Sequence, residues 1–291
     1  MSVPIIEFRN VSKWYGEGDK KTEVLSNINL KIEEGEFLAI VGFTGSGKTT
    51  LVNMMTGLDR PSEGEVLYRG KPITGPAPER GIIFQNYSLL PWFTVYQNVA
   101  LAVNEVYANW PRAKRDEHIR NFIEMVNLTP ATNKRPQELS GGMKQRTSIA
   151  RVLATDPDLL LMDEPLGALD ALTRGNLQEE ILNIWSANRR TAVLITNDVD
   201  EGIFMADRII PLEPGERSGL GPEYRIELPR PRNKKALNSD PHFKKVRTDI
   251  LNYLVQLGEA AKLERDDSLE LPDLQPIMPG TKSFAWLRRA S

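Results

Sequence analysis

Short apolar runs bounded by turn residues fill roughly the first eighty positions of the chain, and this pattern predicts β-strands. The runs lie at Ile5 to Phe8, Val24 to Ile32, Phe37 to Val41 and Glu65 to Tyr68, the last after the turn-rich Pro61 to Gly64. A helix-compatible stretch from Thr49 to Thr56 interrupts them. We therefore expect a strand-rich part with one inserted helix.

The spacing of apolar residues changes from Tyr96 to about Leu128. Apolar positions there recur at helical intervals with charges on the opposite face, as in Ile119, Phe122, Ile123 and Val126. This pattern predicts a helical insertion over about residues 86 to 155.

Two continuous apolar runs follow, Leu159 to Met162 and Ala192 to Ile195, without the alternation of a half-exposed strand. The stretch between them, Leu172 to Asn188, has the period of an amphipathic helix. A strand, a helix and a second strand form the unit that parallel pairing requires. The predicted fold class is therefore α/β.

Beyond Leu212 the chain has glycine and proline turns, a predicted strand from Tyr224 to Leu228 and a basic stretch from Arg230 to Lys235. Apolar residues then mark one more amphipathic helix, namely Phe243, Val246, Ile250 and Leu254. The last twenty-five residues contain prolines and are weakly patterned, which fits either a disordered tail or one ordered by a partner. We expect a main domain over residues 1–228 and a helical extension with a tail over 229–291.

Composition excludes several classes of protein. The 291 residues include 37 basic and 39 acidic side chains, so the chain lacks the basic field of a general nucleic-acid binder. With no cysteine and only two histidines, disulfides, thiolate sites and histidine-rich metal clusters are not expected. Neither a leader sequence nor an apolar run of about 18 to 20 residues is present, which predicts a chain that stays in the cytosol.

The segment Gly42 to Thr49 reads GFTGSGKT and matches the phosphate-binding pattern G-x-x-x-x-G-K-[ST] between a strand and a helix. In this pattern, backbone N–H groups face the phosphates, Lys48 reaches the β- and γ-phosphates, and Thr49 places a hydroxyl on Mg²⁺. The structural alternative, a glycine-rich turn, does not require the flanking strand and helix. We expect the nucleotide to contact Gly42, Phe43, Thr44, Gly45, Ser46, Gly47, Lys48, Thr49 and Thr50.

Two adjacent acids, Asp163 and Glu164, end the buried strand in LLLMDEP. In open α/β sheets, ligands bind at this carboxyl edge. Asp163 can hold the Mg²⁺ that Thr49 also contacts, and Glu164 can polarise a water for attack on the γ-phosphate. An isolated acidic pair is more often a solvated strand end, but the phosphate loop favours the catalytic interpretation.

The segment Leu139 to Arg146, LSGGMKQR, adds a family signature, and with it residues 5 to 212 resemble the ATP-binding subunits of ABC transporters. The resemblance implies a P-loop ATPase core with an antiparallel β subdomain and a helical subdomain, using ATP and Mg²⁺. It also implies that Ser140, Gly141 and Gly142 close over ATP held by an opposite subunit in a head-to-tail dimer. The alternative for these residues is an ordinary serine-capped helix.

Three more positions match the family pattern. Tyr15 resembles the aromatic residue that stacks on adenine, although a surface aromatic in a turn is the alternative. Gln85 resembles the glutamine that senses Mg²⁺ and the γ-phosphate and links the site to the helical insertion. Asp170 resembles the aspartate that bridges the subunits, and it could equally cap the next helix.

The finer resemblance is to importers of nitrate, sulfonate and bicarbonate, through QNYSLLPWFTVYQNVALAV and PRPRNKKALNSDPHFKKVR. Nitrate is the favoured cargo. The resemblance implies a subunit on the cytoplasmic face of the inner membrane that hydrolyses ATP. Its implied partners are membrane-spanning permease subunits, a second ATP-binding subunit and an external substrate-binding protein, with no nucleic acid. A soluble ABC-type ATPase of translation or DNA repair is the less favoured alternative, because such relatives carry two cores or long coiled-coil insertions.

The sequence departs from the family at Asn197, where a histidine usually contacts the γ-phosphate. An asparagine amide can donate a hydrogen bond but cannot carry the imidazolium charge or relay a proton. We therefore expect slow hydrolysis at the chain's own site and a heterodimer in which its signature completes a competent partner site. The alternative is a regulatory subunit with negligible catalysis, against which the retained Glu164 argues.

Overall fold

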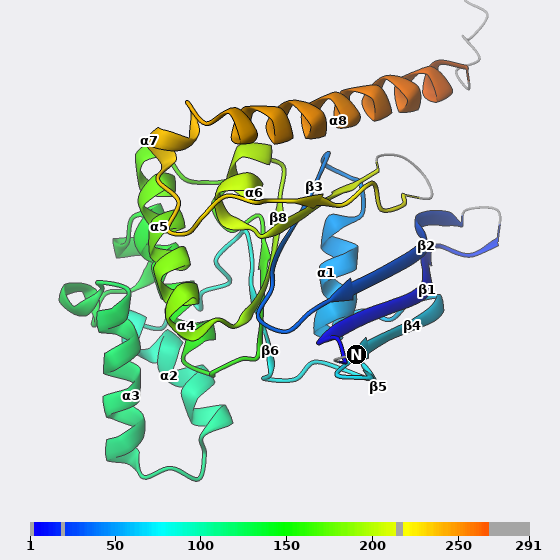
Figure 1. Cartoon of the computed structure of the whole chain (residues 1–291). Coiled ribbons are helices and arrows are strands. Elements are labelled where there is room, and N and C mark those ends of the chain that lie inside the picture. Colours follow the sequence, from blue (N-terminus) through cyan, green and yellow to red (C-terminus); the bar gives the residue numbers. More distant parts are fainter. Residues whose placement is uncertain (1–2, 19–20, 214–217, 268–291) are drawn as a thin grey trace, which may run out of the picture.

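The computed structural model describes residues 3–18, 21–213 and 218–267. Its elements fall into a four-stranded antiparallel sheet, a six-stranded sheet, a group of helices beside them and a long C-terminal helix (Figure 1). The predicted C-terminal tail lies almost entirely outside the described residues.

The four-stranded sheet has the order β2-β1-β4-β5. Its strands are β1 (Ile6–Tyr15), β2 (Thr22–Ile32), β4 (Glu63–Tyr68) and β5 (Lys71–Pro72). The strand predicted at Ile5 to Phe8 is therefore longer than expected. It continues through register shifts between Phe8 and Trp14, which break the simple alternation of buried and exposed residues.

The six-stranded sheet has the order β10-β9-β3-β8-β7-β6 and is parallel except for β10 at its edge. Its strands are β3 (Phe37–Gly42), β6 (Arg80–Ile83), β7 (Leu159–Asp163), β8 (Thr191–Thr196), β9 (Arg208–Leu212) and β10 (Tyr224–Arg225). The strand predicted at Tyr224 to Leu228 is thus limited to two residues. Because β3, β8 and β7 are neighbours and parallel, the loops that follow them meet at one edge.

Both faces of the six-stranded sheet are covered. Along β3, Phe37, Ala39 and Val41 belong to one hydrophobic cluster, while Leu38 and Ile40 belong to the other. The first cluster lies against the helical part of the chain, and the second lies against α1 (Lys48–Thr56) and the four-stranded sheet. Coverage on both faces explains why these strands read as continuous apolar runs.

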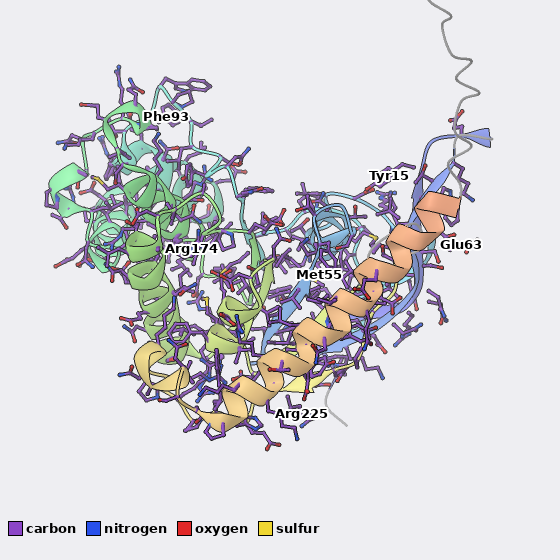
Figure 2. The ribbon with its side chains drawn as sticks, turned by 90° about the horizontal axis from the view of Figure 1, so that it is seen from above. Tyr15, Met55, Glu63, Phe93, Arg174 and Arg225 are labelled. Atoms are coloured by element: carbon purple, nitrogen blue, oxygen red, sulfur yellow. The ribbon has the colours of Figure 1, made fainter. Side chains whose placement is uncertain are left out.

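The helical insertion contains α2 (Val95–Val106), α3 (Arg112–Met125) and α4 (Gly141–Leu153), with short 3₁₀ turns at η2 (Thr129–Ala131) and η3 (Pro136–Glu138). Pro111 precedes α3 and separates it from α2, since proline cannot continue a helix that precedes it. Helix α5 (Ala171–Asn188) then connects β7 to β8, as predicted. In Figure 2, Phe93 and Arg174 lie on the helical side, whereas Tyr15 and Glu63 lie on the antiparallel-sheet side.

The C-terminal extension contains α7 (Lys234–Leu237) and α8 (Pro241–Asp267), preceded by α6 (Val199–Met205) in the main domain. The predicted apolar stripe of α8 is buried at Phe243, Val246, Ile250 and Leu254. Helix α8 runs across one end of the molecule (Figure 1) and passes close to the phosphate loop, since a Cβ at Gly258 would lie 3.4 Å from the Phe43 ring.

Candidate nucleotide site

The loop between β3 and α1 has the features of an anion-binding site. Gly47 precedes the helix with φ 90° and no side chain caps the first turn, so its backbone N–H groups are available to a ligand. A residue with a side chain would be strained at this φ, and its Cβ would lie 2.9 Å from Leu25 Cδ2. The buried Ser46 Oγ has no hydrogen-bond partner among the described residues. These features fit a bound phosphate.

Lys48 is held inside this loop. Its Nζ donates to the carbonyl oxygens of Gly42 at 3.1 Å and Phe43 at 2.7 Å, and it lies 3.7 Å from Glu164 Oε1. The side chain is only 4% exposed. Burial lowers the pKa of Lys48, and the charges of Glu164 and Asp163 act in the opposite direction. The ammonium group can therefore be shared between the loop and a bound anion.

Thr49 and Asp163 meet although they lie 114 positions apart, because α1 follows β3 and Asp163 ends β7. Thr49 Oγ1 donates to Asp163 Oδ2 at 3.1 Å. Burial raises the pKa of Asp163, while the Thr49 hydrogen bond and the Lys48 charge oppose that change. A hydroxyl and a carboxylate are oxygen ligands of the kind that Mg²⁺ prefers, so this pair fits that ion.

Glu164 and Asn197 form the next contact at the same edge. Asn197 Nδ2 donates to Glu164 Oε1 at 2.9 Å. The Glu164 backbone has φ 45°, an uncommon left-handed conformation for this residue type, and its N–H donates to the carbonyl of Ile195 on β8 at 2.9 Å. Strain of this kind is frequent at functional sites. The contact places a carboxylate and an amide side by side next to Lys48.

A cavity of about 520 Å³ opens beside this pair. Gln85, Glu164 and Asn197 all line it, which brings together three residues that lie on different segments of the sequence. Arg174 from α5 and Arg247 from α8 line the same cavity. The pattern of the sequence did not identify these two arginines, because neither belongs to a motif.

Tyr15 lies at the end of β1 and is 45% exposed. Its hydroxyl donates to Asp59 Oδ2 at 2.7 Å, and the Lys13 ammonium lies 4.8 Å from the centre of its ring. The pKa of Tyr15 is raised by burial and by the hydrogen bond with Asp59, and a hydrogen bond with Thr50 on α1 offsets part of this rise. The ring is thus held near the helix that carries the phosphate loop, where it could stack on a base.

The signature segment lies in a different place from the phosphate loop. Ser140 caps α4, its Oγ accepting from Met143 N at 3.3 Å, so the expected helix cap is present. Ser140 and Gly142 line a cavity of about 340 Å³ that shares no lining residue with the cavity beside Glu164. Within the described residues, the signature therefore lines a different cavity from Glu164 and Asn197.

Asp170 also has the capping role that the sequence left open. Its Oδ1 accepts from Thr173 N at 3.0 Å at the start of α5. This hydrogen bond holds the pKa of Asp170 below its usual value. The side chain is exposed, so capping does not prevent a contact with a second subunit.

Gly142 is required by the packing of α4 against α5, which yields a first prediction. A Cβ on Gly142 would lie 2.6 Å from Thr173 Cγ2, whereas one on Gly141 would have 3.3 Å to its nearest atoms. We expect Gly142→Ala to lower the free energy of unfolding in urea by about 1–3 kcal/mol through overpacking. Gly141→Ala should cost less, and adding Thr173→Ser to Gly142→Ala should restore most of the loss. Equal losses in the two alanine variants would contradict this account.

The sequence did not predict a chain of hydrogen bonds that joins Gln178, Glu201 and Thr196 at the cavity. The buried Glu201 accepts from Gln178 Nε2 at 2.8 Å and from the Thr196 hydroxyl. Burial raises the pKa of Glu201. Thr196 and Gln178 lie five and twenty-three positions from Glu201 and belong to other elements. The position of the charged Glu201 on the apolar side of α6 was therefore the only signal in the sequence for these hydrogen bonds.

The fold and the site together define a P-loop ATPase of the ABC type. Residues 25–167 match the family model described as ABC transporter. The chain belongs to this family, since a member that it covers over 90% of its length is 43% identical.

Two curated relatives and one solved structure illustrate the similarity. The nitrate import ATP-binding protein NrtC of Synechocystis sp. is 45% identical over 90% of this chain, which spans 39% of that relative's length. The bicarbonate transport ATP-binding protein CmpD of Synechococcus elongatus is 43% identical over 86% of this chain and 90% of its own length. The ATP-binding cassette MJ0796, solved as a dimer bound to ADP and Pi, is 31% identical, with a TM-score of 0.68 over 77% of this chain and 99% of its own.

A helix that spans a bilayer needs about 20 predominantly apolar residues, and this length and hydropathy can be looked for in the helices of the described residues. None of them is long and apolar enough to span a membrane.

Proposed function

We propose that this chain is the ATP-hydrolysing subunit of an ABC importer for a small anion. The observation that carries the proposal is the meeting of Lys48, Thr49, Asp163 and Glu164 at the uncapped start of α1. A lysine, a hydroxyl, a metal-binding carboxylate and a base at one helix terminus are the parts that phosphoryl transfer requires.

Each residue has a defined task in this proposal. The phosphate loop binds the β- and γ-phosphates, Thr49 and Asp163 hold Mg²⁺, and Glu164 accepts a proton from the attacking water. Mg²⁺ would neutralise charge on the phosphate oxygens. Tyr15 would stack on adenine, and Gln85, which lines the same cavity as Glu164, would contact the metal and the γ-phosphate.

We propose a second ATP-binding subunit because the signature lines a different cavity from the one that Glu164 and Asn197 line. In the proposed head-to-tail arrangement, Ser140, Gly141 and Gly142 offer the start of α4 to ATP on the partner. Asp170 lies on an exposed turn where it can bridge the two subunits. The partner is proposed to be a related, histidine-containing chain, since Asn197 weakens this chain's own site.

The cargo is proposed to be nitrate, with bicarbonate and sulfonate as the competing anions. The relatives named for nitrate and for bicarbonate import have nearly equal identity to this chain, so they do not separate the two. Permease subunits, an external binding protein and attachment to the cytoplasmic face of the membrane complete the proposed assembly. The cargo is tested by measuring the uptake of nitrate and, separately, of bicarbonate in cells with and without this chain.

Identification of the subunits that co-purify with this chain tests the proposed assembly. Mass spectrometry of the purified membrane complex should find permease subunits and a second ATP-binding chain. Copies of this chain alone as the ATP-binding pair would reject the heterodimer. Recovery without any membrane protein would reject the transport assignment.

The substitution Asn197→His tests whether the asparagine limits hydrolysis. With the second ATP-binding chain inactivated, we expect ATP turnover of the assembled complex to rise by about tenfold or more, because imidazole can carry charge and relay a proton near Glu164. ATP affinity should change little, since Asn197 contacts Glu164 and not the phosphate loop. The assay is phosphate release at saturating ATP, with Asn104→His on α2 as a control for added histidine. Unchanged turnover would show that Asn197 does not limit hydrolysis and would remove this argument for a heterodimer with unequal sites.

A further inference from the structure

Helix α6 begins two residues after Asn197 and contains only seven residues. A helix this short is unstable by itself, so its position depends on its surroundings. Asp198 caps its start by accepting from the N–H groups of Asp200 at 2.9 Å and Glu201 at 3.1 Å. Whatever holds α6 therefore also sets where Asn197 lies.

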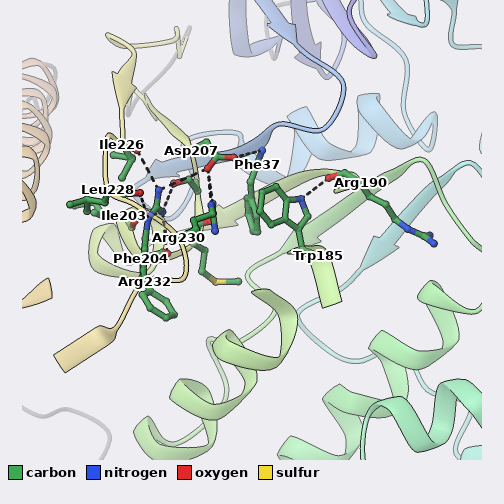
Figure 3. A network of polar contacts seen from close by, with 12 residues as sticks. Phe37, Trp185, Arg190, Ile203, Phe204, Asp207, Ile226, Leu228, Arg230 and Arg232 are labelled. Carbon is green, nitrogen blue, oxygen red and sulfur yellow. Dashed lines mark hydrogen bonds and ion pairs between the residues drawn. The ribbon is translucent and has the colours of Figure 1, made fainter. Parts of the chain in front are cut away.

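The end of α6 is held by Arg232 from the C-terminal extension. Its Nη1 donates to the carbonyl oxygens of Ile203 at 2.9 Å, Phe204 at 3.2 Å and Ala206 at 2.6 Å (Figure 3). The Arg232 side chain is 1% exposed. Burial lowers the pKa of Arg232 to about 10, so it remains charged at neutral pH. A positive charge at a helix C-terminus satisfies free carbonyls and stabilises the helix dipole.

Arg230 fastens the same segment to the body of the protein. It donates to Met205 O at 2.6 Å and to Asp207 Oδ1 at 2.8 Å, and its guanidinium lies 4.4 Å from the Trp185 ring centre. The other Asp207 oxygen accepts from the N–H of Phe37 on β3 (Figure 3). The extension is thereby anchored to the central sheet as well as to α6.

The start of α6 is held from a second direction by α8. Arg247 forms an ion pair with Asp200 in the first turn of α6. Arg247 and Leu251 also line the cavity that contains Glu164 and Asn197. The extension thus forms part of the wall of the candidate site.

A third connection runs from the exposed Lys234 to three buried side chains. Lys234 on α7 donates to Gln178 Oε1 at 2.7 Å, and Gln178 in turn donates to Glu201. Glu201 accepts from the hydroxyl of Thr196, which immediately precedes Asn197. This chain of hydrogen bonds links the extension to the end of β8.

We propose that residues 229–254 clamp α6 and thereby position Asn197 against Glu164, with Arg247 and Lys234 as positioning residues. The inference rests on the proposed ATPase function. A displacement of about 1 Å in a reacting group can lower a rate by about 100-fold, so loss of one of several supports should have a smaller but measurable effect.

The substitution Arg247→Gln tests this clamp in the full chain assembled with its partners, with the second ATP-binding chain inactivated so that turnover reports the site of this chain. Its ion pair is half exposed, so folding should be preserved. We expect kcat for ATP hydrolysis to fall about three- to tenfold with KM changed less than twofold. Arg247→Lys should restore most of the rate. The matched control is Arg120→Gln, which removes a similarly exposed pair with Asp116 on α3 and should leave kcat unchanged.

Hydrogen–deuterium exchange gives a readout that does not depend on turnover. Backbone amides of residues 196–205 should exchange faster in Arg247→Gln and in Lys234→Met than in the wild-type chain. In Arg120→Gln their exchange rates should equal those of the wild type. If the wild-type complex hydrolyses no ATP, the proposed function fails, and exchange alone then decides whether the clamp exists. Unchanged exchange in both variants would overturn it. In an active complex, unchanged kcat, or a loss of rate that Arg247→Lys does not rescue, would overturn the positioning role.

Discussion

Replacing Glu164 with glutamine is expected to lower ATP turnover by about 10²- to 10⁴-fold while ATP still binds. Glutamine has nearly the same shape and retains an oxygen that can accept the hydrogen bond from Asn197 Nδ2. It cannot accept a proton from water at neutral pH. Because binding is retained and hydrolysis is blocked, ATP should also hold the variant in its paired state.

Phosphate release and size-exclusion chromatography with ATP and Mg²⁺ measure the two effects in the isolated chain and in the assembled complex, with the second ATP-binding chain inactivated so that turnover reports the site of this chain. Glu65→Gln is the matched control, since Glu65 is an exposed carboxylate on β4 that pairs with Arg9 at 3.2 Å. Its turnover should equal that of the wild type. A Glu164→Gln variant within threefold of wild-type turnover would exclude Glu164 as the base.

Replacing Lys48 with methionine is expected to weaken ATP binding by about 10- to 100-fold, since a hydrogen bond to a charged group contributes about 1.5–3 kcal/mol. Turnover should fall as well, because the ammonium group would no longer stabilise charge on the phosphates. Methionine is chosen because the Lys48 side chain is buried, and a shorter residue would leave a cavity.

Equilibrium binding of a fluorescent ATP analogue measures this change, and thermal unfolding checks the fold. The substitution removes the donor to Gly42 O and Phe43 O, so some loss of stability is expected in the nucleotide-free protein. Lys31→Met serves as the control, because that lysine is 66% exposed on β2. Equal ATP affinity in the Lys48 and Lys31 variants would contradict the assignment of the phosphate loop.

The site also depends on residues that no motif identifies. Arg232, Arg247 and Lys234 lie in a basic stretch and an amphipathic helix that the sequence indicates only as an extension. Arg232 and Arg247 contact the segment of α6, and Lys234 contacts Gln178 on α5. These contacts join residues 26 to 56 positions apart, and such pairs leave no periodic pattern. The sequence consequently predicts a separate extension, whereas in the structure residues of this extension contact the candidate site.

The class of fold and a candidate phosphate-binding segment could both be predicted from the sequence alone. Continuous apolar runs at β3, β7 and β8 require burial on both faces, and the spacing of glycines, Lys48 and Thr49 is a local property of one loop. The capping roles of Ser140 and Asp170 were likewise visible beforehand as alternatives, because a cap depends on residues three positions apart.

Only the tertiary structure decided how these pieces meet. The order of β3, β8 and β7 in the sheet brings Thr49 to Asp163 and Asn197 to Glu164. It also leaves the signature at a separate cavity and lays α8 along the wall of the site. Strand order and helix docking are set by the burial of side chains from distant segments, so the local pattern of the sequence cannot specify them.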